Sequence, residues 1–183
     1  MLLHLVDTMP RKPVEPRFFR LPVVAHGAEF LVQGYLMRRN ILTYKAPPNN
    51  EGYDLICIHP DPRKVTKQIR VQVKSRFATN SGLGFPVHAK SFDAFDFLIA
   101  AFLNIGYFGR GRTTLEGQSE PVFYTLPVQF IRKHHRPSDS WPSIRLRDLD
   151  ETEREKYKDD RGFELIARAL KVPYPAKPPR EDG

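Results

Sequence analysis

The chain has 183 residues, of which 29 are Lys or Arg and 21 are Asp or Glu, and its formal net charge is +8. This length fits one domain with terminal arms and argues against two full domains. The positive charge favours partners rich in phosphate, nucleic acid above all, although a soluble basic protein without such a partner is the plainer alternative.

The single cysteine and the lengths of the apolar runs indicate a cellular compartment. Cys57 lies within an apolar run, so no intramolecular disulfide can form and a buried thiol is expected. Residues 1–6 lack the parts of a signal peptide, and no apolar run is long enough to span a membrane. We therefore expect a cytoplasmic protein with no membrane partner.

Proline-rich segments mark both ends of the chain. Four prolines fall among basic residues in the first 22 positions, and four more occur between residues 173 and 179. Such segments resist regular structure. We expect a basic arm over residues 1–20, an α/β core over 21–136, an extension with a helix over 137–172, and a flexible tail over 173–183.

The first half of the core reads as one helix followed by three strands. Apolar residues recur at helical spacing from Ala28 to Leu36, and Arg38 and Arg39 suit the end of a helix. A short strand over 41–44 and a turn over 46–50 follow. Residues 53–58 and 68–74 then predict a hairpin, because the second segment alternates strictly between apolar and polar residues.

The second half of the core is richer in apolar runs. Residues 95–102 favour a strand covered on both faces, although periodicity alone also allows a buried helix. Residues 122–126 and 128–131 predict further extended structure, broken at Pro127. Residues 151–171 predict a helix with one apolar stripe, which we expect Gly162 to interrupt.

Three polar residues mark a candidate site on the predicted hairpin. Side chains alternate along a strand, so Gln72 and Lys74 leave the same face. Asp54 opens the neighbouring strand, where its carboxylate can converge with the Gln72 carbonyl oxygen on one oxygen-preferring cation. Glu29, on the shoulder of the first helix, can lean over the sheet edge toward the same point.

The order of these residues resembles that of the PD-(D/E)XK nuclease superfamily. Glu29 in a leading helix, Gly52-Tyr53-Asp54 entering a strand and Gln72-Val73-Lys74 carry the likeness, over roughly residues 26 to 130. The resemblance is closest to restriction-endonuclease-like and Holliday-junction-resolvase-like members. It implies an α/β fold with a restriction-endonuclease-like core, in which helices flank a central mixed β-sheet.

The resemblance also implies an activity and a role for each matching residue. The activity is metal-dependent hydrolysis of DNA phosphodiester bonds, with Mg²⁺ or Mn²⁺ as the cofactor. Asp54, Gln72 and Glu29 would be the metal ligands, Glu29 as an auxiliary one, and Lys74 would orient and activate water. A homodimer is possible.

The chain departs from the family pattern in two places. Most members carry an acid where this chain has Gln72, so the site has one negative charge fewer and should hold its cation less tightly. Residues 75–94 leave room for only a stub of the family's second helix, around residues 89–95.

Other readings of these residues remain open. An Asp followed by Gln-x-Lys arises often by chance and can be an exposed row of polar strand residues. A nuclease fold can also persist without chemistry, as a nucleic-acid-binding or assembly module, since fold does not establish function.

Two basic segments are candidate contacts for nucleic acid. Arg110 and Arg112 lie in a glycine-rich segment that reads equally as an ordinary hairpin loop. Arg132, Lys133 and Arg136 form a run that is either a phosphate-binding surface or a solvated strand end. His134 and His135 lie within this run, but neighbours on a strand face opposite ways and cannot readily chelate one zinc ion.

Overall fold

The computed structural model describes residues 21–48, 50, 52–80, 82–109, 112–137 and 141–174. The arm expected over residues 1–20 and the tail from residue 175 onward lie outside these ranges. Within the described ranges, none of the helices combines the length and the apolar character that crossing a membrane requires.

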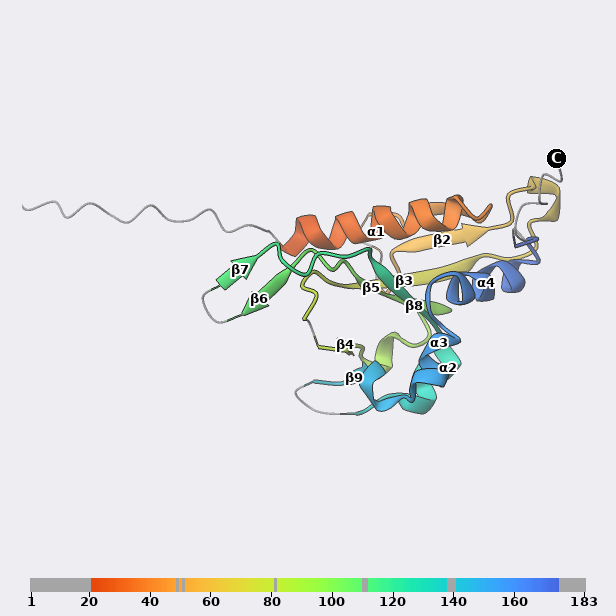
Figure 1. The fold of residues 1–183 in the computed structure, drawn as a ribbon. Helices are drawn as coiled ribbons and strands as arrows, with labels where there is room; N and C mark the ends of the chain where they lie inside the picture. The colour runs from red at the N-terminus through yellow and green to blue at the C-terminus, as the bar shows by residue number, and fades with distance from the viewer. Residues whose placement is uncertain are drawn as a thin grey trace, which may run out of the picture.

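A central sheet of five strands organises the molecule, in the order β1-β2-β3-β5-β8 (Figure 1). The strands are β1 (Leu42–Lys45), β2 (Leu55–Ile58), β3 (Ile69–Arg76), β5 (Phe97–Phe102) and β8 (Val122–Pro127). Neighbours are antiparallel except β3 and β5, which run parallel. The predicted mixed sheet is confirmed, and so is the hairpin of β2 and β3.

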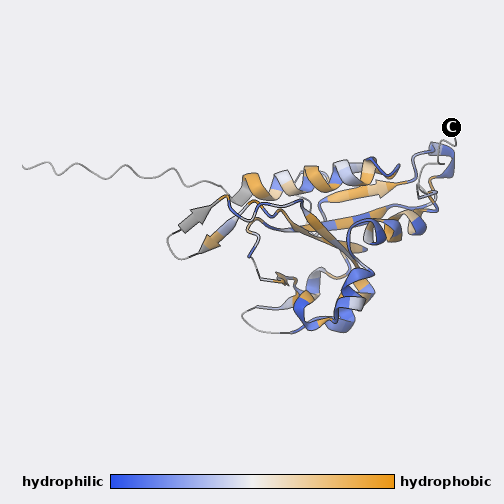
Figure 2. Ribbon diagram, in the orientation of Figure 1, coloured by the Kyte–Doolittle hydropathy of each residue, from blue (hydrophilic) through white to orange (hydrophobic). Residues whose placement is uncertain are grey.

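One face of the sheet is covered by α1 (Leu21–Met37) and α4 (Asp159–Leu170). Their apolar residues pack into one core cluster with those of β2, β3 and β5. Cys57 is buried in this cluster as a free thiol, and burial raises its pKa to about 12. Figure 2 shows hydrophobic residues concentrated in the sheet, whereas hydrophobic and hydrophilic residues alternate along α1.

The other face carries a second core cluster beneath shorter elements. These are β4 (Gly84–Pro86), η2 (Ala89–Ser91), α2 (Val128–His134), β9 (Ser143–Arg145), η3 (Leu146–Asp148) and α3 (Glu151–Glu155). Residues of β5 alternate between the two clusters, so this strand is buried on both faces, as the sequence predicted. Two further elements lie outside the sheet, η1 (Pro62–Lys64) and the hairpin of β6 (Tyr107–Gly109) with β7 (Arg112–Thr114).

The connection between β3 and β5 shapes the second face. Parallel neighbours cannot be joined by a tight turn, so the chain must cross over between them. Residues 77–96 make this crossover and carry β4, which pairs with β9, and η2. The expected stub of a helix around residues 89–95 is thus a single 3-10 turn.

Two expectations for the later elements were wrong. Residues 128–131 are not extended but belong to α2, whose buried Val128, Phe130 and Ile131 also fit one helix face; four residues are too few to separate the two periods. Gly162 lies inside α4 and does not interrupt it, since the break falls between α3 and α4. A Cβ at Gly162 would lie 2.1 Å from the Tyr157 carbonyl oxygen, so this glycine allows a close approach of backbone.

Candidate active site

Asp54 stands where β2 begins and its pairing with β3 ends. Its amide donates to the Val71 carbonyl, and its Oδ2 accepts from the Val73 amide at 2.7 Å. The carboxylate thus replaces the next ladder carbonyl, because the preceding residues turn away from β3. Gly52 makes this turn with φ of 97°, and a Cβ there would lie 2.3 Å from the Cβ of Ala94.

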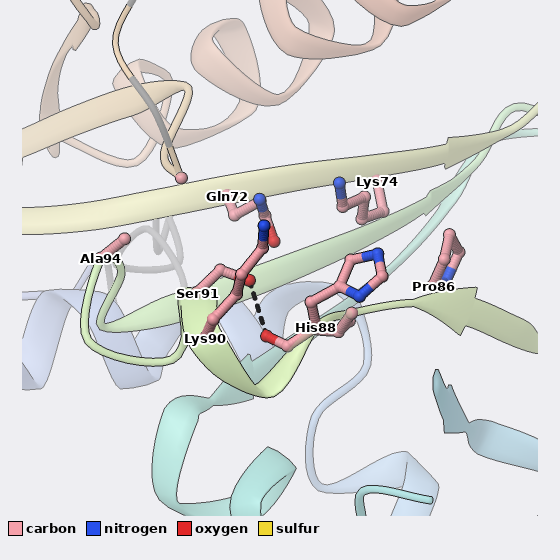
Figure 3. A pocket seen from close by; sticks show the side chains of 9 residues that line it. Gln72, Lys74, Pro86, His88, Lys90, Ser91 and Ala94 are labelled. Atoms are coloured by element: carbon pink, nitrogen blue, oxygen red, sulfur yellow. Dashed lines mark hydrogen bonds between the residues drawn. The ribbon is translucent and has the colours of Figure 1, made fainter. Parts of the chain in front are cut away.

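β3 directs Gln72 and Lys74 away from α1. Val71 belongs to the cluster beneath α1, and the alternation of the strand sends Gln72 and Lys74 to the opposite face (Figure 3). Gln72 is only 9% exposed, and its Oε1 is buried without a hydrogen-bond partner among the described residues. Lys74 is half-buried and makes no ion pair with the described residues.

A cavity of about 370 Å³ lies between β3 and the crossover segment. Its wall is made of Gly52, Gln72, Lys74, Pro86, Val87, His88, Lys90, Ser91 and Ala94. Figure 3 shows Gln72 and Lys74 projecting from β3 into this space, with His88 and Lys90 projecting from the η2 side. Among the described residues, the polar lining of this cavity is Gln72, Ser91 and three basic side chains, with no carboxylate.

Glu29 and Asp54 line a different cavity, of about 490 Å³, together with Lys45 and His26. Glu29 is engaged in an ion pair with Lys45. The four residues of the sequence hypothesis are thus divided, Glu29 and Asp54 on one side and Gln72 and Lys74 on the other. Gly52 lines the first cavity and Asn50, Tyr53 and Asp54 line the second, and the Asp54 carboxylate accepts from the amide of Val73, the residue between Gln72 and Lys74.

The described residues contain no group of three or more His, Cys, Asp or Glu side chains that could hold a metal ion. Of the ligands expected from the sequence, the Asp54 carboxylate accepts from a backbone amide and the Oε1 of Gln72 has no partner among the described residues. Mg²⁺ is commonly held by one or two carboxylates completed by water and substrate phosphates. These two oxygens alone would be an incomplete ligand set, which a divalent ion would have to complete with water and a phosphate group.

The sequence matches no protein-family model and no curated protein. Among solved structures, it is similar to the bacterial homing endonuclease I-Ssp6803I, with a TM-score of 0.50 and 18% identity over 83% of this chain and 94% of that chain. The chain has the restriction-endonuclease-like fold. It also matches Hjc, a Holliday junction resolvase from Archaeoglobus fulgidus, with a TM-score of 0.43 and 10% identity over 83% of this chain and 99% of that chain.

The predicted basic run lies at the end of α2 and just after it. Arg132 pairs with Asp93 at 2.6 Å and Arg136 with Asp148 at 3.0 Å, whereas Lys133 makes no ion pair with the described residues. Arg110 lies outside the described residues, and for Arg112 only the backbone, in β7, is described.

The two neighbouring histidines of this run have separate surroundings. His134 ends α2, where its ring stacks on Phe130 at 4.3 Å between centroids. The Nε2 of His135 lies 2.8 Å from the Val87 carbonyl oxygen. The expectation that a strand carries these two histidines was wrong, because His134 belongs to a helix and His135 caps it.

Sequence reasoning missed the wall of the cavity formed by His88, Lys90 and Ser91. No periodicity marks them, since they lie in a connection made of one strand and one helical turn. The available signal was the set of apolar anchors around them, Val87 and Phe92, which are both buried in the second cluster. Anchors on both sides indicate that the intervening polar residues are held against the core.

Proposed function

We propose that this chain is a metal-dependent nuclease that hydrolyses DNA phosphodiester bonds. The observation that carries the proposal is the bond from the Val73 amide to Asp54, which holds a carboxylate beside the backbone that joins Gln72 to Lys74. The restriction-endonuclease-like fold supports interpreting this arrangement of Asp54, Gln72 and Lys74 as a nuclease site.

Asp54 and Gln72 are the ligands that we assign to a divalent ion, Mg²⁺ or Mn²⁺. An amide oxygen that is buried without a partner is costly in a folded protein, and a cation offers it the missing contact. Glu29 would join as an auxiliary ligand only by leaving Lys45. Without Glu29 the ligand set carries a single full charge, so the phosphate of the substrate has to contribute to binding.

Hydrolysis requires charge stabilisation at the scissile phosphate. When bound, a divalent ion polarises the phosphate and lowers the pKa of a neighbouring water molecule. Lys74 leaves the same strand face as Gln72 and has no competing ion pair with the described residues, so its ammonium is available to offset charge that develops in the transition state.

The basic residues at the end of α2 and just after it are the proposed contacts for more distant phosphates. The ion pairs of Arg132 and Arg136 join half-exposed guanidinium groups to surface carboxylates. Such pairs are worth little in water, so DNA phosphates can compete for the same cations. Arg110 and Arg112 belong to this proposal on sequence grounds alone.

A nuclease-fold binding or assembly module without catalysis is the second candidate. One observation favours it, namely that Asp54 lines one cavity and Gln72 lines another. The neutral amide of Gln72 also leaves the ion with one carboxylate rather than two. The two candidates differ in one measurable property, which is cleavage that depends on a divalent ion.

Cleavage of supercoiled plasmid in Mg²⁺, in Mn²⁺ and in EDTA tests the proposal. Wild-type protein should cleave only with the metals, and Asp54→Asn and Lys74→Ala should both lose cleavage. Asn at position 54 keeps an oxygen that can accept from the Val73 amide, so folding is preserved. Lys67→Ala, which removes an exposed lysine outside the cavity, is the matched control and should cleave like wild type.

Cleavage of equal rate by Asp54→Asn or Lys74→Ala would overturn the assigned roles. DNA binding without any metal-dependent cleavage would favour the module.

A further inference from the structure

The cavity between β3 and η2 is electropositive. Lys74 reaches it from β3, and His88 and Lys90 reach it from the opposite wall (Figure 3). The nearest carboxylates on the crossover segment are engaged elsewhere, since Asp93 pairs with Arg132 and Asp96 with Arg70. Neither Lys74 nor Lys90 makes an ion pair with the described residues. Since the described lining of this cavity has basic side chains on both walls and no carboxylate, an anion between the walls would be stabilised.

The η2 wall is held in place by apolar anchors. Val87 and Phe92, on either side of the turn, are buried in the second core cluster. The Ser91 hydroxyl donates to the His88 carbonyl at 2.7 Å, which closes the turn. The contact of Ala94 with the glycine at position 52 fixes the far end of the segment. Lys90 is therefore presented by a rigid element, which favours binding because less motion is lost.

The size of the cavity fits a phosphate together with its sugar. Its volume is about 370 Å³. Sites for small ligands commonly span about 300 to 1,000 Å³. The buried amide of Gln72 lies at the β3 wall, where its NH₂ group can donate to a phosphate oxygen while its Oε1 turns to a cation.

We propose that η2 forms the second wall of a phosphodiester-binding cleft, in which Lys90 and His88 hold the backbone of a nucleic-acid strand against Lys74 and Gln72. The identity of the ligand as a nucleic-acid strand rests on the proposed function. The residues of η2 lie outside the metal ligands assigned above, so their contribution is to binding and positioning.

Binding of a fluorescently labelled DNA duplex, measured by anisotropy in EDTA across a salt series, tests this cleft without any cleavage. Lys90→Gln should weaken binding about tenfold, or about 1.4 kcal/mol. It should also lower the slope of log affinity against log salt by about one. Lys67→Gln removes the same charge from an exposed site outside the cleft and should change affinity less than twofold.

A separate arm distinguishes a strand from a free anion. Inorganic phosphate and a mononucleotide are titrated into wild type and Lys90→Gln by calorimetry, and both should bind far more weakly than the duplex. Phosphate binding that depends on Lys90 but is not displaced by duplex DNA would overturn the assignment to a strand.

The outcomes separate this inference from the proposed function. Equal binding by Lys90→Gln and Lys67→Gln would overturn the η2 wall, while metal-dependent cleavage that requires Asp54 and Lys74 would still stand. A loss of affinity in Lys90→Gln together with no metal-dependent cleavage by wild type would support the cleft and overturn the nuclease.

Discussion

Two regions of the molecule differ in whether their polar side chains have partners. One lies between α1 and β1, and the other lies between β3 and η2. Near α1, Glu29 pairs with Lys45, the Gln33 amide donates to the Thr43 carbonyl, and the Thr43 hydroxyl donates to the Ile41 carbonyl. Near η2, the Oε1 of Gln72 is buried without a partner and Lys74 has no ion pair with the described residues.

The polar groups between α1 and β1 thus have partners within the chain, whereas Gln72 has an oxygen beside a cavity that is unpartnered among the described residues; buried unpartnered atoms away from this cavity include Thr125 Oγ1 and Ser143 Oγ. Buried polar groups in folded proteins nearly always have a partner, so an exception beside a cavity needs an explanation. A local arrangement that costs stability, such as an unpartnered buried oxygen, is kept where it supports function. Substitutions on the sheet face covered by α1 and α4, the first face, should change stability. Substitutions on the opposite face, which carries Gln72 and η2 and is the second face, should change ligand binding.

The largest effect is expected for Phe163→Ala. Phe163 is fully buried beneath α1 and contacts the rings of Tyr35 and Phe123. Its truncation should lower the free energy of unfolding by about 3–5 kcal/mol. Phe30→Ala is the matched control, because Phe30 is 61% exposed, and it should cost less than about 1 kcal/mol. Urea denaturation measures both, and similar losses in the two variants would contradict the assignment of the core.

A smaller loss of stability is expected for Gly162→Ala. The added Cβ would meet the Tyr157 carbonyl oxygen at 2.1 Å, which forces α4 away from the preceding turn and should cost about 1–3 kcal/mol. Gly34→Ala is the control in α1, where a Cβ meets nothing within 4 Å, and it should stabilise by about 0.5–1 kcal/mol. Equal thermal shifts of the two variants would show that no close approach exists at Gly162.

The third prediction concerns metal affinity at the second face. Gln72→Glu adds a full charge at nearly the same reach and should tighten Mn²⁺ binding on the order of tenfold. Cleavage at low Mg²⁺ should rise, and the gain should vanish once the ion saturates the site. Gln68→Glu, an exposed position just before β3, is the control for added charge. Unchanged or weaker affinity in Gln72→Glu, by calorimetry, would mean that position 72 does not face the ion.

The smallest effect is expected at the surface of the first face. Hydrogen bonds from Arg39 lower the pKa of Asp160, which also accepts from Tyr174 at 3.2 Å. A lowered folded-state pKa stabilises the protein above the ordinary value near 3.8, and this gain is lost as pH falls. Asp160 is 70% exposed, so Asp160→Asn should cost about 0.2–1 kcal/mol at pH 7. A difference that persists at pH 2 would contradict the ionic origin.

Much of the fold could be predicted because long periodic segments encode it. The helical spacing from Ala28 to Leu36 predicted α1, and the apolar run of β5 favoured a strand buried on both faces, although its periodicity alone also allowed a buried helix. The strand β3 lies between the two regions. Its Val71 and Val73 point toward α1, and its Gln72 and Lys74 point away from it. Its alternation placed those two residues on one face from sequence alone.

The parts that could not be predicted depend on tertiary contacts. The helix α2 was missed because four residues fit both periods, and Gly162 was misread because its close contact with Tyr157 is set by packing. The η2 wall was missed because Lys90 is 16 positions from Lys74 in a connection without periodicity. Nor could sequence show that Glu29 is engaged by Lys45, since both residues suit other partners equally well.

Gln72→Met gives the most direct test of the central claim, that the β3 and η2 face keeps an unmet polar group for its ligand. Methionine has a similar volume and no amide, so the substitution removes a buried group without a partner. The free energy of unfolding of the Gln72→Met protein should rise by about 1–3 kcal/mol, while metal-dependent cleavage is lost. A Gln72→Met protein that is no more stable than wild type and still cleaves plasmid at the wild-type rate would contradict it.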